Sequence, residues 1–222
     1  MTTNRPLIHE EQPVLTRGVP LHEATSAMIM VHGRGATARD ILALSDEFVA
    51  PSMAFLAPQA AQNTWYPYSF LAPIAQNEPY LSSALTNLSN ILMTLGEAGI
   101  APQRTVLLGF SQGACLATEF AARNPQQYGA VVGLSGGLIG PPGTPRDYDG
   151  SLQGVSVFLG CSDVDPHIPV ERVNETEQTL ARMGANVTKR LYAGMGHLVN
   201  EDEITRIQTL LEPITINAEG SA

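Results

Sequence analysis

A serine flanked by glycines stands in this chain where a buried-strand pattern passes directly into a helix pattern. The segment Gly109-Phe110-Ser111-Gln112-Gly113 follows the mostly apolar run Thr105-Val106-Leu107-Leu108 and precedes apolar residues at helical spacing over 114–121. This arrangement predicts a nucleophile elbow, a tight turn that holds a serine in a strained backbone conformation at the top of a sheet. Ser111 is therefore the candidate nucleophile, presented beside the first amides of the helix.

A serine nucleophile needs a base that takes its proton and an acid that orients this base, in the chain order serine, acid, histidine. The apolar run Val155–Gly160 leads into Asp163 and Asp165, and the run Val187–Tyr192 leads into His197. Because each group follows the end of a predicted strand, a parallel sheet would bring them to one edge, where ligands bind in open α/β folds. His197 is the candidate base, and from spacing alone either aspartate can be the acid.

Ordinary structural roles compete for each of these residues taken singly. An aspartate after a strand is most often a turn residue or a helix cap, and a histidine after Gly194-Met195-Gly196 could simply fill a turn. Asp163, Asp165 and His167 could also converge on a divalent cation, although two nearby prolines explain that segment as a rigid turn. The convergence of serine, acid and histidine is the stronger argument, and it requires no metal and no organic cofactor.

A tetrahedral intermediate also requires two N–H donors aimed at its oxyanion. One candidate is the backbone N–H of Gln112, directly after the serine. The second is the backbone N–H of Arg34, which follows His32-Gly33 at the end of the apolar run Ala27–Val31. We expect the His32 imidazole to hold this loop by hydrogen bonds rather than to act in catalysis.

Two long irregular segments, residues 58–79 and 136–154, are placed to overhang such a site. Their apolar side chains could form the wall of an acyl pocket or could simply pack against the core. The candidate pocket residues are Trp65, Tyr66, Phe70, Leu71, Leu138 and Ile139.

Short apolar runs alternate with helical patterns along the chain, which predicts a mostly parallel sheet of about seven strands covered by helices on both faces, without a large cap domain. The predicted strands are Val14–Arg17, Ala27–Val31, Met53–Ala57, Thr105–Leu108, Val131–Leu134, Val155–Gly160 and Val187–Tyr192. The predicted helices are Asp40–Phe48, Tyr80–Ala98, the segment after Ser111, Val170–Met183 and Glu201–Leu211.

Composition narrows the class of protein. The 222 residues are 44% hydrophobic and contain no polar linker, so we expect one domain spanning 1–222. With a net charge of −9 and only 12 Lys and Arg residues, the chain lacks the excess positive charge that binding to nucleic acid or to anionic membranes requires. There is no apolar signal core and no window of the ~20 apolar residues that cross a bilayer, so we expect a cytoplasmic protein without stable membrane insertion. Cys115 and Cys161 are expected to be reduced core residues.

Together these motifs resemble the phospholipase/carboxylesterase group of α/β-hydrolases, which includes acyl-protein thioesterases and small bacterial carboxylesterases. The resemblance spans most of the chain. The segments that carry it are His32-Gly33-x-Gly35, the Trp65 loop, Gly109–Gly113, Asp165-Pro166-His167-Ile168-Pro169 and Gly194–His197. It implies an α/β-hydrolase fold and a serine carboxylesterase of small-molecule esters, with thioesters and lysophospholipid-like esters among its possible substrates. The alternative is an acyl-protein or acyl-CoA-type thioesterase.

The resemblance also bears on the acid. Family members place the catalytic acid in an Asp-Pro-x-x-Pro pattern, which only Asp165 matches here. Gly160 is followed by four residues before Asp165, where the family commonly has two, so Asp163 stays an alternative. The stretch 66–79 departs from the expected thioesterase version and leaves the acyl preference open. A non-catalytic ligand-binding relative would lack one or more catalytic residues, whereas this sequence has a candidate for each catalytic residue and each oxyanion donor. We expect the protein to be a monomer or a homodimer.

Overall fold

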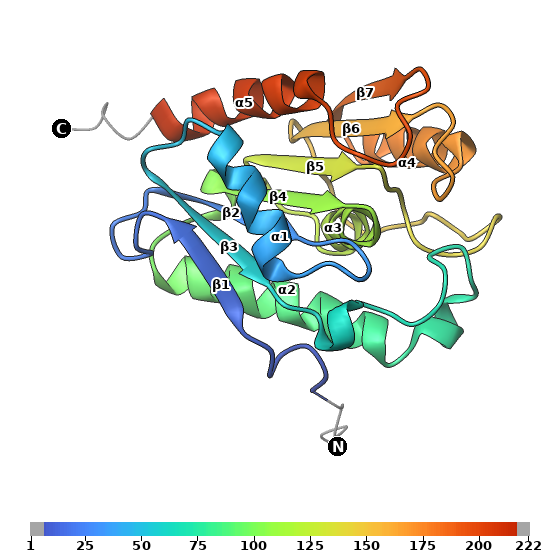
Figure 1. Cartoon of the computed structure of the whole chain (residues 1–222), viewed down its shortest axis with the longest axis horizontal. Coiled ribbons are helices and arrows are strands. Elements are labelled where there is room, and N and C mark those ends of the chain that lie inside the picture. Colours follow the sequence, from blue (N-terminus) through green and yellow to red (C-terminus); the bar gives the residue numbers. More distant parts are fainter. Residues whose placement is uncertain (1–6, 217–222) are drawn as a thin grey trace.

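A seven-stranded sheet runs through the centre of the molecule (Figure 1). In the computed structural model, which describes residues 7–216, the strand order is β1-β3-β2-β4-β5-β6-β7. β1 pairs antiparallel with β3 at one edge, and every other pair is parallel. The strands are β1 (Val14–Gly18), β2 (Ser26–Val31), β3 (Met53–Pro58), β4 (Thr105–Phe110), β5 (Ala130–Leu134), β6 (Ser156–Ser162) and β7 (Asn186–Tyr192). The predicted mostly parallel sheet is confirmed.

Helices cover both faces of this sheet and bury two separate apolar layers (Figure 1). Helices α2 (Tyr80–Glu97), α3 (Gln112–Arg123) and α4 (Val170–Arg182) pack on one face, and α1 (Ala38–Ala43) and α5 (Glu201–Ile216) pack on the other. Successive residues of β2 alternate between the two layers. A strand covered on both faces must be apolar on both, which explains the uninterrupted run over 27–31.

Two helices differ from their predicted bounds by more than one residue. The helix predicted over 40–48 begins at Ala38, because Thr37 and Asp40 form a capping box, and it changes after Ala43 into a 3₁₀ turn over Leu44–Glu47. The last helix continues to Ile216 rather than ending near residue 211, although it contains a proline, which normally ends or kinks a helix.

The connection between β3 and α2 contains only two short 3₁₀ turns, Ala61–Asn63 and Ile74–Asn77. A further 3₁₀ turn, Pro102–Arg104, precedes β4. The residues that the structure describes contain no large cap over the sheet edge. None of the described helices has the length and apolar character to span a membrane.

Candidate active site

Ser111 lies in the sharp turn between β4 and α3, as the sequence pattern predicts. Its backbone has φ 56° and ψ −121°, a region that non-glycine residues rarely adopt. The neighbouring glycines allow the turn because no side chain fits there: a Cβ on Gly109 would lie 2.2 Å from the carbonyl oxygen of Gly113, and one on Gly113 would lie 2.0 Å from that of Val31. The turn therefore exposes the serine hydroxyl at the carboxyl edge of the sheet.

His197 links Ser111 to Asp165. His197 Nε2 lies 2.9 Å from the Ser111 hydroxyl, and His197 Nδ1 lies 2.7 Å from Asp165 Oδ2. The three side chains follow β4, β6 and β7, whose parallel arrangement brings them to one edge. An Nδ1–H that donates to Asp165 leaves Nε2 free to accept the serine proton.

The Asp165 carboxylate is held at both oxygens. Its side chain is fully buried. Oδ1 accepts the backbone N–H groups of His167 (2.8 Å) and Ile168 (3.1 Å), while Oδ2 faces His197. Burial raises the pKa of this carboxyl, but the hydrogen bonds from His197 and from the two N–H groups outweigh burial and lower the pKa below its ordinary value. Asp165 is therefore a carboxylate at neutral pH.

Asp163 occupies a different place. Its Oδ1 accepts the backbone N–H of Gly194 at 2.8 Å, in the loop between β7 and His197. Ser162 supports the same loop, because its hydroxyl accepts the N–H of Gly196 at 3.1 Å. Asp163 contacts the loop that carries His197 rather than the imidazole itself. The residues that the structure describes contain no group of three or more His, Cys, Asp or Glu side chains suited to a metal ion.

Gln112 and Arg34, the predicted oxyanion donors, both lie beside Ser111. Gln112 is the first residue of α3, where a backbone N–H has no acceptor within the helix. Gly33 brings the neighbouring loop close, since a Cβ there would lie 3.3 Å from the Cβ of Ser111. Both predicted donors border the cavity that opens at Ser111.

The side chains of these two residues hold one loop. The Arg34 guanidinium donates to the carbonyl oxygens of Tyr66 (2.9 Å), Pro67 (3.0 Å) and Tyr68 (2.7 Å). The buried Gln112 carboxamide accepts the N–H of Trp65 at 2.9 Å and donates to the carbonyl oxygen of Tyr66 at 2.9 Å. Residues 65–68 are therefore fixed by the same two residues whose amides border Ser111.

The cavity at Ser111 has a volume of about 460 Å³, and we call it the Ser111 cavity. Two of the predicted pocket residues, Tyr66 and Phe70, line it. Sequence reasoning missed Cys115, one helical turn after the serine, and Phe110, whose ring centroid lies 5.0 Å from that of His197. Their positions in and just after the Gly-Phe-Ser-Gln-Gly motif were the available signal. His167 also lines the cavity, with its ring centroid 4.8 Å from that of His197.

The other four predicted pocket residues do not line the Ser111 cavity. Trp65 is fully buried, because its indole Nε1–H donates to the carbonyl oxygen of His32 at 2.9 Å. The His32 ring in turn accepts the N–H of Ala60 and contacts the carbonyl oxygen of Gly33 at 2.8 Å. This supports the interpretation that His32 holds the loop. Leu71 is half-buried against the core.

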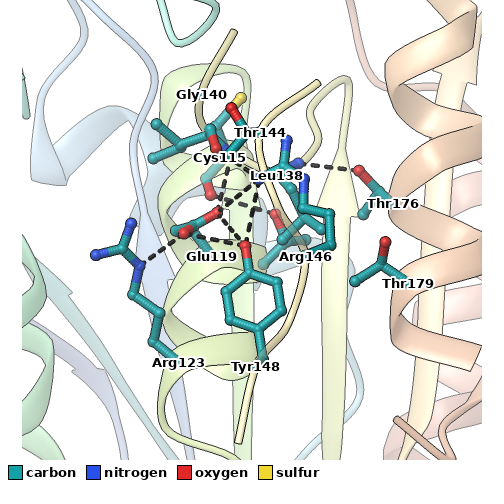
Figure 2. A network of polar contacts seen from close by, with 12 residues as sticks. Cys115, Glu119, Arg123, Leu138, Gly140, Thr144, Arg146, Tyr148, Thr176 and Thr179 are labelled. Atoms are coloured by element: carbon teal, nitrogen blue, oxygen red, sulfur yellow. Dashed lines mark hydrogen bonds and ion pairs between the residues drawn. The ribbon is translucent and has the colours of Figure 1, made fainter. Parts of the chain in front are cut away.

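Leu138 and Ile139 are fully buried. A network of polar and charged side chains that includes Glu119 and Arg146 lies around Leu138 (Figure 2). Glu119 of α3, with a side chain only 1% exposed, accepts the N–H of Ile139 at 2.9 Å. Arg146 donates to the carbonyl oxygen of Ile139 at 2.7 Å. Arg172 donates to the carbonyl oxygens of Leu138 and Gly140 at 2.5 and 2.7 Å. Leu138 and Ile139 therefore belong to the support of the loop and not to the pocket surface.

The same network supports the cavity wall from behind. The N–H of Gly140 donates to the carbonyl oxygen of Phe70 at 2.7 Å, and the Arg172 guanidinium lies 5.9 Å from the Phe70 ring centroid.

The two cysteines, Cys115 and Cys161, are free and buried, and burial raises the pKa of each thiol to about 12. The Cys161 thiol lies 3.8 Å from Asp165 Oδ2, behind the carboxylate.

Comparisons with known proteins identify the family and the fold of this chain. A family model described as phospholipase/carboxylesterase matches residues 19–215. The solved structure of a phospholipase/carboxylesterase from Dyadobacter fermentans is 40% identical, has a TM-score of 0.89, and aligns over 94% of this chain and 100% of its own. The Bacillus cereus carboxylesterase shares the fold with a TM-score of 0.72 at 18% identity, over 92% of this chain and 95% of its own.

Curated relatives are more distant. Acyl-protein thioesterase 1 of Gibberella zeae is 28% identical over 125 residues, which cover 55% of this chain and 53% of that protein. Acyl-protein thioesterase 1 of Saccharomyces cerevisiae is 28% identical over 120 residues, which cover 52% of each. The chain thus spans about half the length of these two relatives. With its fold and the match over residues 19–215, the chain belongs to the phospholipase/carboxylesterase family of α/β-hydrolases.

Proposed function

We propose that this protein is a serine carboxylesterase that hydrolyses small-molecule carboxylic esters through Ser111, His197 and Asp165. The observation that carries the proposal is the pair of hydrogen bonds from Ser111 to His197 (2.9 Å) and from His197 to Asp165 (2.7 Å). This is the connectivity of a nucleophile, its general base and the acid that orients the base.

In the first step the Ser111 hydroxyl oxygen bonds to the ester carbonyl carbon while His197 Nε2 takes its proton. Asp165 holds the Nδ1–H tautomer and stabilises the imidazolium. The carbonyl π electrons move to oxygen, and the backbone N–H groups of Gln112 and Arg34 stabilise this oxyanion. Collapse of the intermediate breaks the bond to the leaving group, which receives the proton from His197 and departs as an alcohol.

The acyl group then remains on Ser111 until water attacks it. His197 takes a proton from this water, a second tetrahedral intermediate forms, and its collapse returns the proton to Ser111 and releases a carboxylic acid. Apart from the substrate and water, these steps use only side chains and backbone N–H groups of the protein, so the reaction needs no cofactor. Loss of one oxyanion donor typically costs about 10²- to 10³-fold in turnover.

A thioesterase is the second candidate, because the curated relatives named above are acyl-protein thioesterases. The same residues serve both reactions, and only the leaving atom differs. Matched oxygen and sulfur esters of one acid and one leaving-group skeleton separate the two. A kcat/KM that is higher for the sulfur ester, after division by the uncatalysed hydroxide rate, would favour the thioesterase.

Hydrolysis of p-nitrophenyl esters from acetate to palmitate, with wild type and Ser111→Ala compared, tests the proposal. We expect activity in the wild type that disappears in Ser111→Ala while the melting temperature is maintained, with the chain-length optimum reporting the size of the acyl site. If wild type and variant hydrolyse every ester equally slowly, the protein is not a serine esterase, and a non-catalytic ligand-binding protein becomes the better explanation.

A further inference from the structure

A second hollow lies on the α1 side of the Ser111 turn, and the function proposed above does not use it. This hollow, which we call the α1 cavity, has a volume of about 460 Å³. Its apolar lining is formed by Ile41, Leu44, Phe110 and Val199, and two carboxylates, Asp40 and Glu47, stand among these side chains. It thus combines an apolar surface with fixed negative charge.

The α1 cavity adjoins the Ser111 cavity. The two share Gly33, Ala36 and Phe110 as lining residues. Gly33 approaches the serine so closely that a Cβ there would lie 3.3 Å from the Cβ of Ser111, and the Phe110 ring packs against His197 at a centroid distance of 5.0 Å. A substrate whose carbonyl lies at Ser111 can therefore extend one group into each cavity.

The two cavities differ in the side chains that line them. The lining of the Ser111 cavity includes the buried Tyr66, Phe70 and Cys115 as well as exposed residues such as Tyr68 and His167, and among the described residues it contains no carboxylate. The α1 cavity is lined by two exposed carboxylates, Asp40 and Glu47. In acyl transfer the acyl group stays on the serine after the first step, whereas the leaving group must return to water. The Ser111 cavity, whose described lining has no carboxylate, suits an apolar acyl group, and the α1 cavity, with its two exposed carboxylates, suits the leaving group.

Charge restricts what the α1 cavity accepts. Asp40 is fixed by hydrogen bonds from the backbone N–H and the hydroxyl of Thr37, at 2.7 and 2.8 Å. No ion pair involves Asp40 or Glu47 among residues 7–216. The guanidinium of Arg34, the residue after Gly33, already donates to the carbonyl oxygens of Tyr66, Pro67 and Tyr68. An anionic group in the α1 cavity would therefore meet two carboxylates, and no Lys or Arg in the described part of the chain lines this cavity.

We propose that the α1 cavity binds the leaving group of the substrate and selects a neutral or cationic apolar alcohol or thiol against an anionic one. Thiols that carry phosphate groups and phosphorylated alcohols are then poor leaving groups for this protein. The inference rests on the proposed function, because it names the substrate class of the same site.

The charge test uses acetate esters of three phenols of similar shape: phenyl, 4-carboxyphenyl and 4-(trimethylammonio)phenyl. Each kcat/KM is divided by the hydroxide rate of the same ester, which removes intrinsic reactivity. We expect the wild type to prefer the cationic over the anionic ester on the order of tenfold, from two carboxylates at short range in water. The double variant Asp40→Asn/Glu47→Gln should reduce this ratio to about threefold or less. Glu97→Gln, which removes one exposed charge at the end of α2, should leave it unchanged.

The shape test uses Ala43→Phe, which adds a ring at an exposed position on the α1 cavity, with Ala43→Ser as the size-matched control. We expect Ala43→Phe to lower kcat/KM for a naphthyl ester about fivefold or more relative to the methyl ester of the same acid, with an unchanged acyl-chain profile. A shifted acyl-chain profile, or no change in either series, would overturn the leaving-group assignment.

The two proposals fail in different ways. A flat charge series in an enzyme whose ester hydrolysis depends on Ser111 overturns the inference about the α1 cavity and leaves the esterase intact. The absence of any Ser111-dependent hydrolysis overturns the esterase, and the inference with it. Circular dichroism melts should show that Ala43→Phe and the double variant are folded at the assay temperature, even though Asp40→Asn weakens the capping box of α1, and this ties the kinetic changes to the cavity rather than to unfolding.

Discussion

Replacing Asp165 with asparagine keeps the size of the side chain but reverses the hydrogen bond to His197. In the wild type, Oδ1 accepts two backbone N–H groups and Oδ2 accepts from His197 Nδ1. An asparagine must keep its carbonyl oxygen toward the two N–H groups, so its NH₂ group faces Nδ1. The imidazole then has to accept at Nδ1 and carry its proton on Nε2, where it can no longer take the proton of Ser111.

The size of the effect follows from the loss of the base. In serine proteases, the wrong histidine tautomer lowers kcat about 10⁴-fold. At ~1.36 kcal/mol per factor of ten, this corresponds to about 5.4 kcal/mol of transition-state stabilisation. We therefore expect Asp165→Asn to retain on the order of 10⁻⁴ of the wild-type kcat, with a KM that changes little because the carboxylate is buried behind His197.

Asp163→Asn is the matched control. Its carbonyl oxygen can still accept the N–H of Gly194, as the Asp163 carboxylate does at 2.8 Å, so we expect less than about a tenfold loss. The assay is kcat and KM for p-nitrophenyl butyrate at pH 8, with melting curves for both variants. A larger loss in Asp163→Asn than in Asp165→Asn, with both proteins folded, would refute the assignment of the acid.

Three further predictions concern residues around the site. Arg34→Met should lower kcat/KM about tenfold, more for longer acyl chains than for acetate, because the carbonyl oxygens of Pro67 and Tyr68 lose the guanidinium donor and that of Tyr66 keeps only its other donors; Arg34→Lys should restore only part, since an ammonium group cannot span the three oxygens. Burial raises the pKa of Glu203 to about 7, so the folded state keeps a proton that the unfolded state loses near the ordinary pKa. The free energy of unfolding should therefore fall as pH rises from about 4.5 to about 7, by at most about 3 kcal/mol, and Glu203→Gln should abolish this slope in urea titrations. Glu119→Ala should cost about 3 to 5 kcal/mol in urea unfolding, because Arg123 and the N–H of Ile139 lose their acceptor and the buried Arg146 loses an ion-pair partner; a loss below about 1 kcal/mol would contradict that role.

The sheet and the edge where Ser111, Asp165 and His197 meet could be predicted because topology alone decides them. Strands buried on both faces have continuous apolar runs, as in β2 and β4, and parallel strands end at one edge. Spacing could not decide between the two aspartates after β6. The turn there sends Asp165 toward His197 and Asp163 toward Gly194, and this depends on backbone hydrogen bonds that spacing does not encode.

The pocket was harder to predict, because apolar loop residues have the same pattern whether they line a cavity or pack beneath it. The buried Trp65 donates its indole N–H to the carbonyl oxygen of His32, which lies in a loop distant in the sequence. Leu138 is buried since the Arg172 side chain of α4, only 3% exposed, turns inward and donates to the carbonyl oxygen of Leu138. Such long-range polar contacts have no local signature in the sequence.

The most direct test of the central claim is to map where a fluorophosphonate probe attaches to the protein. The probe phosphonylates a serine only when a base removes its proton, so it reports the activated nucleophile without any assumption about the substrate. We predict that mass spectrometry finds one modified residue, Ser111, in the wild type, and that labelling disappears in Ser111→Ala and slows strongly in His197→Ala. An unmodified Ser111 in the folded wild type, or labelling that persists unchanged in His197→Ala, would contradict the proposed mechanism.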